Sequence, residues 1–155
     1  MKGKLWVSVL AILLIFSGCA NRAQKQVSID KSEIILQAVD HYLSTTPENW
    51  RMVKNTWLKE KLDKGEVSDI FIVDIRSPES FSRGHIEGAI NIPFKELAKK
   101  ENLAKLPRDK TIVIVCTTGH SASMANVVLN LLGYKAVTMK YGMKGWEQEN
   151  FPVVK

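Results

Sequence analysis

Cysteine is scarce in this chain, which holds only Cys19 and Cys116 among its 155 residues. One pair of thiols cannot build a disulfide-rich scaffold, and Cys19 and Cys116 lack the close spacing of the cysteines in a structural zinc site. Their sequence surroundings differ so much that a disulfide between them is not expected. No second cysteine lies near Cys116, which excludes a Cys-x-x-Cys redox motif as well. Cys116 is therefore a thiol without a resolving partner in the domain.

Long runs of basic residues are also absent, although the formal net charge is +6. Basic side chains never cluster beyond pairs such as Lys99 and Lys100, so the positive stripe that binds nucleic acid is missing. The charge predicts an ordinary solvated surface, with a weak attraction to anionic lipid as the alternative.

The chain is 45% hydrophobic and 25% charged, with only 9 Gly and 5 Pro. This composition argues against a disordered chain and favours a globular one. Its length suits a single domain.

The longest nearly unbroken apolar run covers residues 5–16, close to the N-terminus. A helix of that length rises about 18 Å, which is less than the roughly 30 Å hydrocarbon core of a bilayer. Two lysines precede the run, and this order is typical of a cleaved secretory signal. The small residues Ser17 and Gly18 before Cys19 resemble the bacterial lipobox, in which the cysteine is acylated and becomes the mature N-terminus.

We therefore expect residues 1–18 to be a signal peptide and residues 19–29 to be a tether that is lipidated at Cys19. Multiple acyl chains hold a protein firmly at a membrane, since each buried methylene contributes about 0.8 kcal/mol. This interpretation predicts a lipid-anchored protein of the cell envelope that faces the extracytoplasmic side. The alternatives are a plain secreted protein and an uncleaved signal that holds the chain weakly at the membrane.

The rest of the chain predicts an α/β fold. Apolar residues at helical spacing predict a helix over residues 30–44, within an N-terminal extension of residues 30–48. Residues 49–155 alternate apolar runs with helical segments, which predicts a single domain with a central parallel sheet of about five strands flanked by helices. The expected strands are 50–53, 70–74, 89–92, 111–116 and 136–139. The expected helices run from 55 to a turn at 64–65, over 94–100 and over 121–132. Four aromatic residues are expected to be at least half-buried, namely Trp50, Trp57, Tyr134 and Trp146.

The most informative segment joins the strand that ends at Cys116 to the helix over residues 121–132. Ligand sites in parallel sheets gather beyond the carboxyl ends of the strands, where Cys116 stands. A strand, a tight loop and a helix start bring several backbone N–H groups to one point. These donors and the helix dipole stabilise a thiolate there. The predicted site is Cys116 as the reactive group, with substrate-binding residues Thr117, Thr118, Gly119, His120 and Ser121.

Three ordered motifs resemble the rhodanese family. Residues 73–81, VDIRSPESF, and residues 84–93, GHIEGAINIP, are similar to its upstream signature. The Cys116 loop follows them, and residues 132–134, LGY, with residues 142–146, GMKGW, are similar to its closing signature. The resemblance implies that the cysteine takes sulfane sulfur from a small donor as a persulfide and passes it to a thiophilic acceptor such as a thiol. It implies no metal and no organic cofactor.

Several polar residues near these motifs have two interpretations. His85 is read as a structural residue that braces the loop before the next strand, rather than as a general base. Asp74 and Arg76 are read as a pair that fixes the strand end, although Arg76 is also placed to face the site mouth. His120 is read as a solvent-facing spacer, with assistance to an anionic donor as the alternative.

Tyr141 stands where the rhodanese family often has glycine, and we expect its side chain to narrow the mouth of the site. Lys140 and Lys144 lie near it in the sequence and are placed to attract an anion. The loop itself lacks the basic residues that thiosulfate-using members of the family tend to carry. The sequence therefore leaves the identity of the sulfur donor open.

Two other functions fit parts of this pattern. The fold also resembles phosphatases and arsenate reductases, whose loop closes with an arginine six positions after the cysteine. Position 122 is alanine and the loop contains no arginine, so the bidentate clamp for a phosphate dianion is missing. The second alternative is a non-catalytic lipoprotein that uses the rhodanese fold to bind a partner or to sense redox state, because a fold does not guarantee a function.

Overall fold

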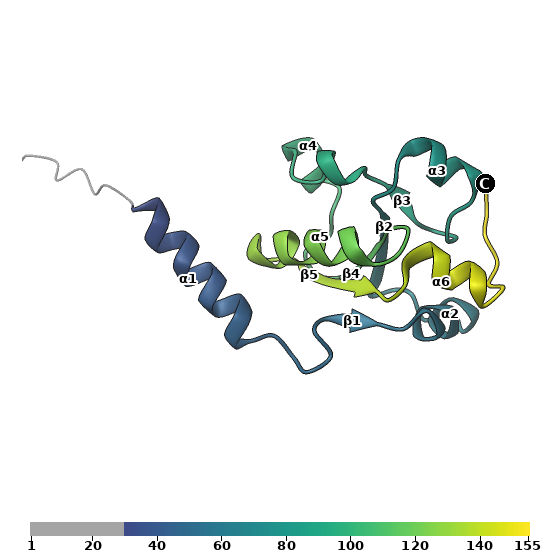
Figure 1. The fold of residues 1–155 in the computed structure, drawn as a ribbon, viewed down its shortest axis with the longest axis horizontal. Helices are drawn as coiled ribbons and strands as arrows, with labels where there is room; N and C mark the ends of the chain where they lie inside the picture. Colours follow the sequence, from purple (N-terminus) through teal and green to yellow (C-terminus); the bar gives the residue numbers. More distant parts are fainter. Residues whose placement is uncertain (1–29) are drawn as a thin grey trace, which may run out of the picture. The chain divides into compact units, whose positions relative to one another are not determined.

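The computed structural model describes residues 30–155; the predicted signal peptide, Cys19 and the tether lie outside the described residues. Five strands form one sheet: β1 (Met52–Val53), β2 (Ile70–Asp74), β3 (Ile90–Asn91), β4 (Thr111–Val115) and β5 (Lys135–Met139). Their order is β1-β5-β4-β2-β3, and all neighbours are parallel (Figure 1). The predicted α/β fold with a five-stranded parallel sheet is confirmed.

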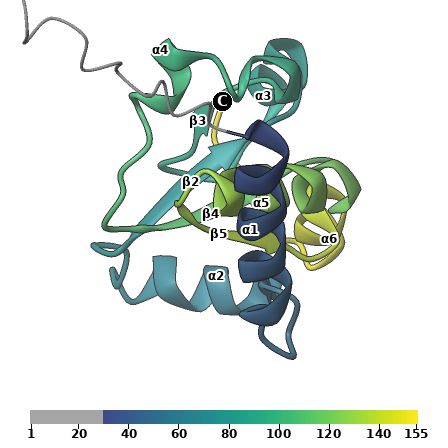
Figure 2. The ribbon, with the colours of Figure 1, turned by 90° about the vertical axis from the view of Figure 1, so that its left-hand side faces the viewer.

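Helices cover both faces of this sheet. Two helices, α2 (Asn55–Asp63) and α6 (Gly142–Gln148), contribute side chains to the core on one face. Two others, α4 (Lys100–Leu103) and α5 (His120–Leu131), contribute to the core on the opposite face. Both views place α2 and α4 on opposite sides of the strands (Figures 1 and 2; Figure 2 is the turned view).

The central strand β4 is buried on both faces, as its unbroken apolar sequence requires. Side chains alternate along a strand, so Ile112 and Ile114 enter the core beneath α5. Val113 and Val115 enter the other core, with α2 and α6. All four side chains have no exposed surface. Residue 116 continues the alternation and therefore points to the α5 side.

Some predicted elements differ from the observed ones. The strand expected at residues 50–53 begins only at Met52, because Trp50 and Arg51 have left-handed backbones with φ of 57° and 54°. Trp50 is also 71% exposed, so the expected burial is wrong for this residue. The helix expected at residues 94–100 is instead a 3₁₀ turn (Phe94–Glu96) followed by α4, because Lys99 between them is extended.

Two helices were not predicted, namely α3 (Pro78–Arg83) and α6. They contain 6 and 7 residues, which is too short for an apolar periodicity to be recognised. The Ser77 hydroxyl caps α3 by accepting a hydrogen bond from the Ser80 amide at 3.3 Å.

The helix that precedes the sheet, α1 (Lys31–Ser44), matches the helix predicted for residues 30–44. It contains no buried residue, and its Ile34, Ile35 and Leu36 side chains are more than half exposed. Within residues 30–155, no helix combines the length and the apolar character that crossing a membrane requires.

Core and surface leucines give a direct test of this packing. Leu129 of α5 has no exposed surface, whereas Leu36 of α1 is 62% exposed. We expect Leu129→Ala to lower the free energy of unfolding by about 2–5 kcal/mol, because it leaves a cavity in the core. Leu36→Ala should change it by less than about 0.5 kcal/mol. Urea unfolding monitored by tryptophan fluorescence measures both, and equal losses would contradict the exposed position of α1.

Candidate functional site

Cys116 directly follows β4, which lies between β2 and β5. The connection after β2 leads to β3, at one edge of the sheet, and the connection after β4 leads to β5, toward the other edge. The two connections therefore diverge at the carboxyl ends of the neighbouring strands β2 and β4. Ligands of open parallel sheets bind at such a divergence. The cysteine belongs to the core cluster beneath α5, and only 3% of its surface is exposed.

The sulfur of Cys116 accepts two backbone hydrogen bonds from the start of α5. The Gly119 amide donates to Sγ at 3.0 Å, and the Ala122 amide donates at 3.4 Å. Amides in the first turn of a helix have no acceptor within that helix, so they are available to another group. Gly119 has a φ of 95°, which glycine adopts without steric cost. Two N–H donors directed at one sulfur stabilise negative charge on it.

The loop residues predicted from the sequence have different positions in the structure. Gly119 donates to the sulfur, but the second donor, Ala122, lies outside the predicted range. His120 Nδ1 lies 2.9 Å from the Thr118 hydroxyl, and both side chains are exposed. His120 is thus exposed and bound to a loop neighbour, and both interpretations of its role stay predictions. Ala122 was missed because a sequence does not show which amide of a first helical turn faces the preceding strand.

The N-terminal end of α6 holds the backbone of the cysteine loop. The Met143 amide donates to the Cys116 carbonyl at 2.8 Å, and the Lys144 amide donates to the Thr117 carbonyl at 2.9 Å. The peptide bonds of the described chain are all trans, so the N–H of each peptide points away from its C=O. With both carbonyls directed at α6, the Thr117 and Thr118 amides therefore point away from α6.

Gly142 allows α6 to approach the loop this closely. A Cβ atom at this position would lie 2.2 Å from the Cys116 carbonyl oxygen and 2.7 Å from the Thr117 carbonyl carbon. Its φ of 53° is also in the left-handed region. Only glycine satisfies both conditions. The sequence identified Gly142 as part of a motif but gave no sign of this contact.

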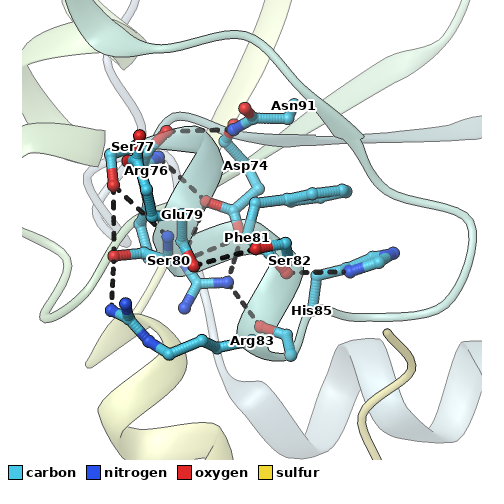
Figure 3. A network of polar contacts seen from close by, with 11 residues as sticks. Asp74, Arg76, Ser77, Glu79, Ser80, Phe81, Ser82, Arg83, His85 and Asn91 are labelled. Carbon is cyan, nitrogen blue, oxygen red and sulfur yellow. Dashed lines mark hydrogen bonds and ion pairs between the residues drawn. The ribbon is translucent and has the colours of Figure 1, made fainter.

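A buried ion pair fixes the end of β2, the strand next to the cysteine strand (Figure 3). Arg76 Nη2 lies 2.6 Å from Asp74 Oδ2, and Arg76 Nε lies within 3.0 Å of both carboxylate oxygens. Arg76 also donates to the Gly84 carbonyl at 2.7 Å. The Arg76 side chain is 10% exposed and the Asp74 side chain 1%. Removing one partner of such a pair costs about 3–5 kcal/mol, so the pair holds the strand end in place.

His85 belongs to the same structural network (Figure 3). Its ring stacks on Phe81 with 3.7 Å between ring centroids, and Nδ1 lies 3.1 Å from the Phe81 carbonyl oxygen. Its backbone exchanges two hydrogen bonds with Val154, each 2.9 Å long. Asn91 Nδ2 donates to the carbonyls of Asp74 and Arg76. These contacts support the structural reading of His85.

The remaining acidic residue of this network is Glu79, at the start of α3. A hydrogen bond from the Ser77 side chain and a second one from the Glu79 backbone amide hold the pKa of the Glu79 carboxyl below its ordinary value.

Within residues 30–155, no three His, Cys, Asp or Glu side chains are grouped in a way that could hold a metal ion.

A cavity of about 540 Å³ lies beside the cysteine loop. Thr118, Gly119 and His120 form part of its wall, whereas Cys116 does not line it. Tyr141, predicted to narrow the mouth, is 71% exposed and lines this cavity. The site therefore combines a nearly buried sulfur with an open cavity that three of its loop residues border.

Known proteins match this chain over most of the described part. A family model described as a rhodanese-like domain matches residues 54–149. The chain is 33% identical over 72 residues to the thiosulfate sulfurtransferase PspE of Escherichia coli (strain K12), covering 46% of this chain and 69% of that protein. It is 30% identical over 95 residues to the putative sulfurtransferase YtwF of Bacillus subtilis (strain 168), covering 61% and 88%.

A solved structure agrees with these matches. The crystal structure of a rhodanese-related protein from Thermoplasma volcanium has a TM-score of 0.60 and 31% identity, over 67% of this chain and 97% of that one. Some relatives are longer, and in one mycobacterial protein the match covers 24% of the length.

The contact between Gly142 and the loop is testable by substitution. We expect Gly142→Ala to lower the free energy of unfolding by at least about 2 kcal/mol more than Gly88→Ala does, because the added methyl meets backbone atoms that cannot move independently. Gly88 is the matched control, since it also has a positive φ, 78°, but nothing lies within 4 Å of its Cβ position. Urea unfolding of both variants gives the difference. Equal losses would mean that α6 can shift away from the loop.

Proposed function

Because the chain belongs to the rhodanese-like family, we propose that it is a sulfurtransferase that carries sulfane sulfur on Cys116. The observation that carries this proposal is the pair of N–H donors on the Cys116 sulfur. Relatives named as sulfurtransferases support the same activity. A further Bacillus subtilis relative, 33% identical over 89 residues and matched over 46% of its length, is named a putative sulfur carrier protein.

The proposed reaction has two displacement steps at sulfur. The Cys116 thiolate attacks the terminal sulfur of a donor, a new S–S bond forms, and the donor's own bond to that sulfur breaks. The remainder of the donor leaves with the bonding electron pair, as sulfite would leave from thiosulfate. An acceptor thiolate then attacks the outer sulfur of the persulfide and releases Cys116 as a thiolate. Charge is conserved in each step, and the covalent intermediate divides the transfer in two.

The loop amides have a defined task in this reaction. Negative charge moves from Sγ to the outer sulfur when the persulfide forms. Gly119 and Ala122 donate to Sγ, and the Thr117 and Thr118 amides point away from α6 and are proposed to receive the outer sulfur. Fixed backbone dipoles of this kind stabilise developing charge without reorganisation.

One observation favours the second function, a rhodanese-fold binding module with an inactive thiol. Only 3% of Cys116 is exposed, and a thiol that no donor reaches cannot become a persulfide. The two functions therefore differ in a single event, the arrival of a donor at Sγ. That event adds the mass of one sulfur atom to the protein.

Intact-protein mass spectrometry separates these functions. The full-length chain with Cys19→Ala has Cys116 as its only thiol, so any sulfur adduct is unambiguous. After incubation with thiosulfate or a polysulfide, we expect one added sulfur atom that cyanide removes. The Cys19→Ala/Cys116→Ser protein is the control and should gain nothing, because a hydroxyl cannot form the persulfide. No adduct with either donor would favour the binding module.

The location of the protein is a separate proposal that rests on the sequence of residues 1–29. We propose that residues 1–18 are removed as a signal, that Cys19 is acylated, and that the tether of residues 19–29 and the extension of residues 30–48 connect the anchor to the domain of residues 49–155. The domain then lies in the cell envelope on the extracytoplasmic side. A nearby membrane is compatible with small sulfur donors and thiol acceptors, which reach the domain by diffusion.

Acyl labelling tests this location in a bacterial expression host. We expect the wild-type chain to incorporate a labelled fatty acid and to sediment with membranes, because the lipobox-like sequence places the acceptor thiol at Cys19. Cys19→Ala should lose both properties, and Cys116→Ala should keep them. Equal labelling of wild type and Cys19→Ala would contradict the anchor without affecting the proposed transfer of sulfur.

A further inference from the structure

The cavity beside the cysteine loop is larger than a sulfur transfer between small inorganic ions needs. Its volume of about 540 Å³ lies in the range of sites that bind organic molecules, roughly 300–1,000 Å³. Met52 of β1 and Thr118 of the loop line it from two sides. Most of the lining surface is apolar. These features indicate a site for an organic body rather than for a bare anion.

The charges on the cavity wall have one sign. Lys140 and Lys144 line the cavity, and no aspartate or glutamate does. Within residues 30–155, neither lysine forms an ion pair with a carboxylate. Unpaired ammonium groups beside an apolar surface favour a ligand that carries a negative group together with an apolar part.

Tyr141 lies between these lysines in the sequence and has an unusual backbone. Its φ of 61° places a bulky residue in the left-handed region, which is a genuine outlier for such a side chain. Its side chain is 71% exposed, so core packing does not compensate for this conformation. Gly145 has no Cβ and thereby leaves room for Tyr141, since a Cβ there would lie 2.5 Å from the Tyr141 Cβ. Strain of this kind concentrates at ligand sites.

We propose that this cavity binds the body of the sulfur acceptor, and that the acceptor is a small organic thiol with an aromatic or other flat apolar part and an anionic group. Tyr141 stacks on the apolar part, and Lys140 and Lys144 pair with the anion. Tyr141 is a specificity-determining residue in this arrangement and touches the acceptor rather than the transferred sulfur. The inference rests on the proposed function of Cys116.

The transfer step balances without a further reactant. The bound acceptor reacts as a thiolate and attacks the outer sulfur of the Cys116 persulfide. The new bond joins the acceptor sulfur to that atom, the bond to Sγ breaks, and Cys116 regains its electron pair as a thiolate. The acceptor leaves as a persulfide anion.

Single-turnover transfer to three matched thiols tests the proposal. The full-length Cys19→Ala chain is loaded with sulfur, freed of donor, and mixed with 4-(mercaptomethyl)benzoate, the neutral phenylmethanethiol or the small anion 3-mercaptopropionate. All three are alkyl thiols, so differences in thiol reactivity are small. We expect the first to react at least about tenfold faster than the other two, as expected for one well-placed contact. Each rate constant is divided by that of the same thiol with a small persulfide in solution, which removes differences in intrinsic reactivity. Equal corrected rate constants would overturn the proposal.

Variants assign the two contacts separately. Tyr141→Gly should remove the preference over 3-mercaptopropionate, whereas Tyr141→Phe keeps the ring and should keep the preference. Tyr141→Gly also relaxes the backbone, so its Tm should not fall, which separates lost recognition from lost folding. Lys140→Met/Lys144→Met should remove the preference over phenylmethanethiol. The control Lys95→Met/Lys135→Met removes two exposed lysines outside the cavity and should keep it.

A binding measurement keeps this proposal distinct from the activity of Cys116. If no donor loads the cysteine, the proposed function fails, and the cavity is then judged by titrating 4-methylbenzoate into the Cys19→Ala chain. NMR shifts that saturate and involve the Tyr141 ring would support an organic-anion site without transfer. Absence of saturation, or equal shifts in Tyr141→Gly at the remaining cavity residues, would overturn the cavity proposal as well.

Discussion

Two hydrogen bonds from α6 to the cysteine loop determine the geometry of the site. The Met143 and Lys144 amides bind the carbonyls of Cys116 and Thr117, and this fixes the orientation of both peptide groups. The Gly119 and Ala122 amides, at the start of a different helix, bind the sulfur. The loop is thus held on its carbonyl side by α6, while α5 supplies the donors. Gly142 is the residue at which α6 touches the cysteine loop, and no side-chain atom fits there.

The strand order explains why these parts come together. With β4 between β5 and β2, the carboxyl end of the cysteine strand has a different neighbour on each side. On the β2 side, the buried Asp74–Arg76 pair and the half-buried His85 contacts form one network. On the β5 side lies the cavity with Tyr141 and two lysines. The β2 side is thus occupied by contacts within the protein, whereas the β5 side holds an open cavity.

The burial of the sulfur has consequences for the chemistry as well. The low dielectric around the buried Cys116 sulfur strengthens the two N–H contacts that Gly119 and Ala122 make with it. The same burial restricts access, since 3% exposure leaves a narrow approach. In the proposed transfer, an acceptor benefits from a second contact surface outside the loop, which is the role we propose for the neighbouring cavity.

The sequence by itself determined the α/β class, the approximate positions of the strands and the place of the cysteine at a strand end. The apolar run of residues 70–74 predicted β2 without error, because a strand buried on both faces leaves a pattern that no surface element shares. The motifs around Cys116 indicated the family because they too are patterns of residues close together in the sequence. Tertiary structure alone decided that Ala122 donates to the sulfur, that α6 binds the loop carbonyls, and that Trp50 is exposed. The α6 contact joins segments far apart in the chain, and the choice of the Ala122 amide and the exposure of Trp50 depend on how the backbone turns, so no local pattern of residues encodes them.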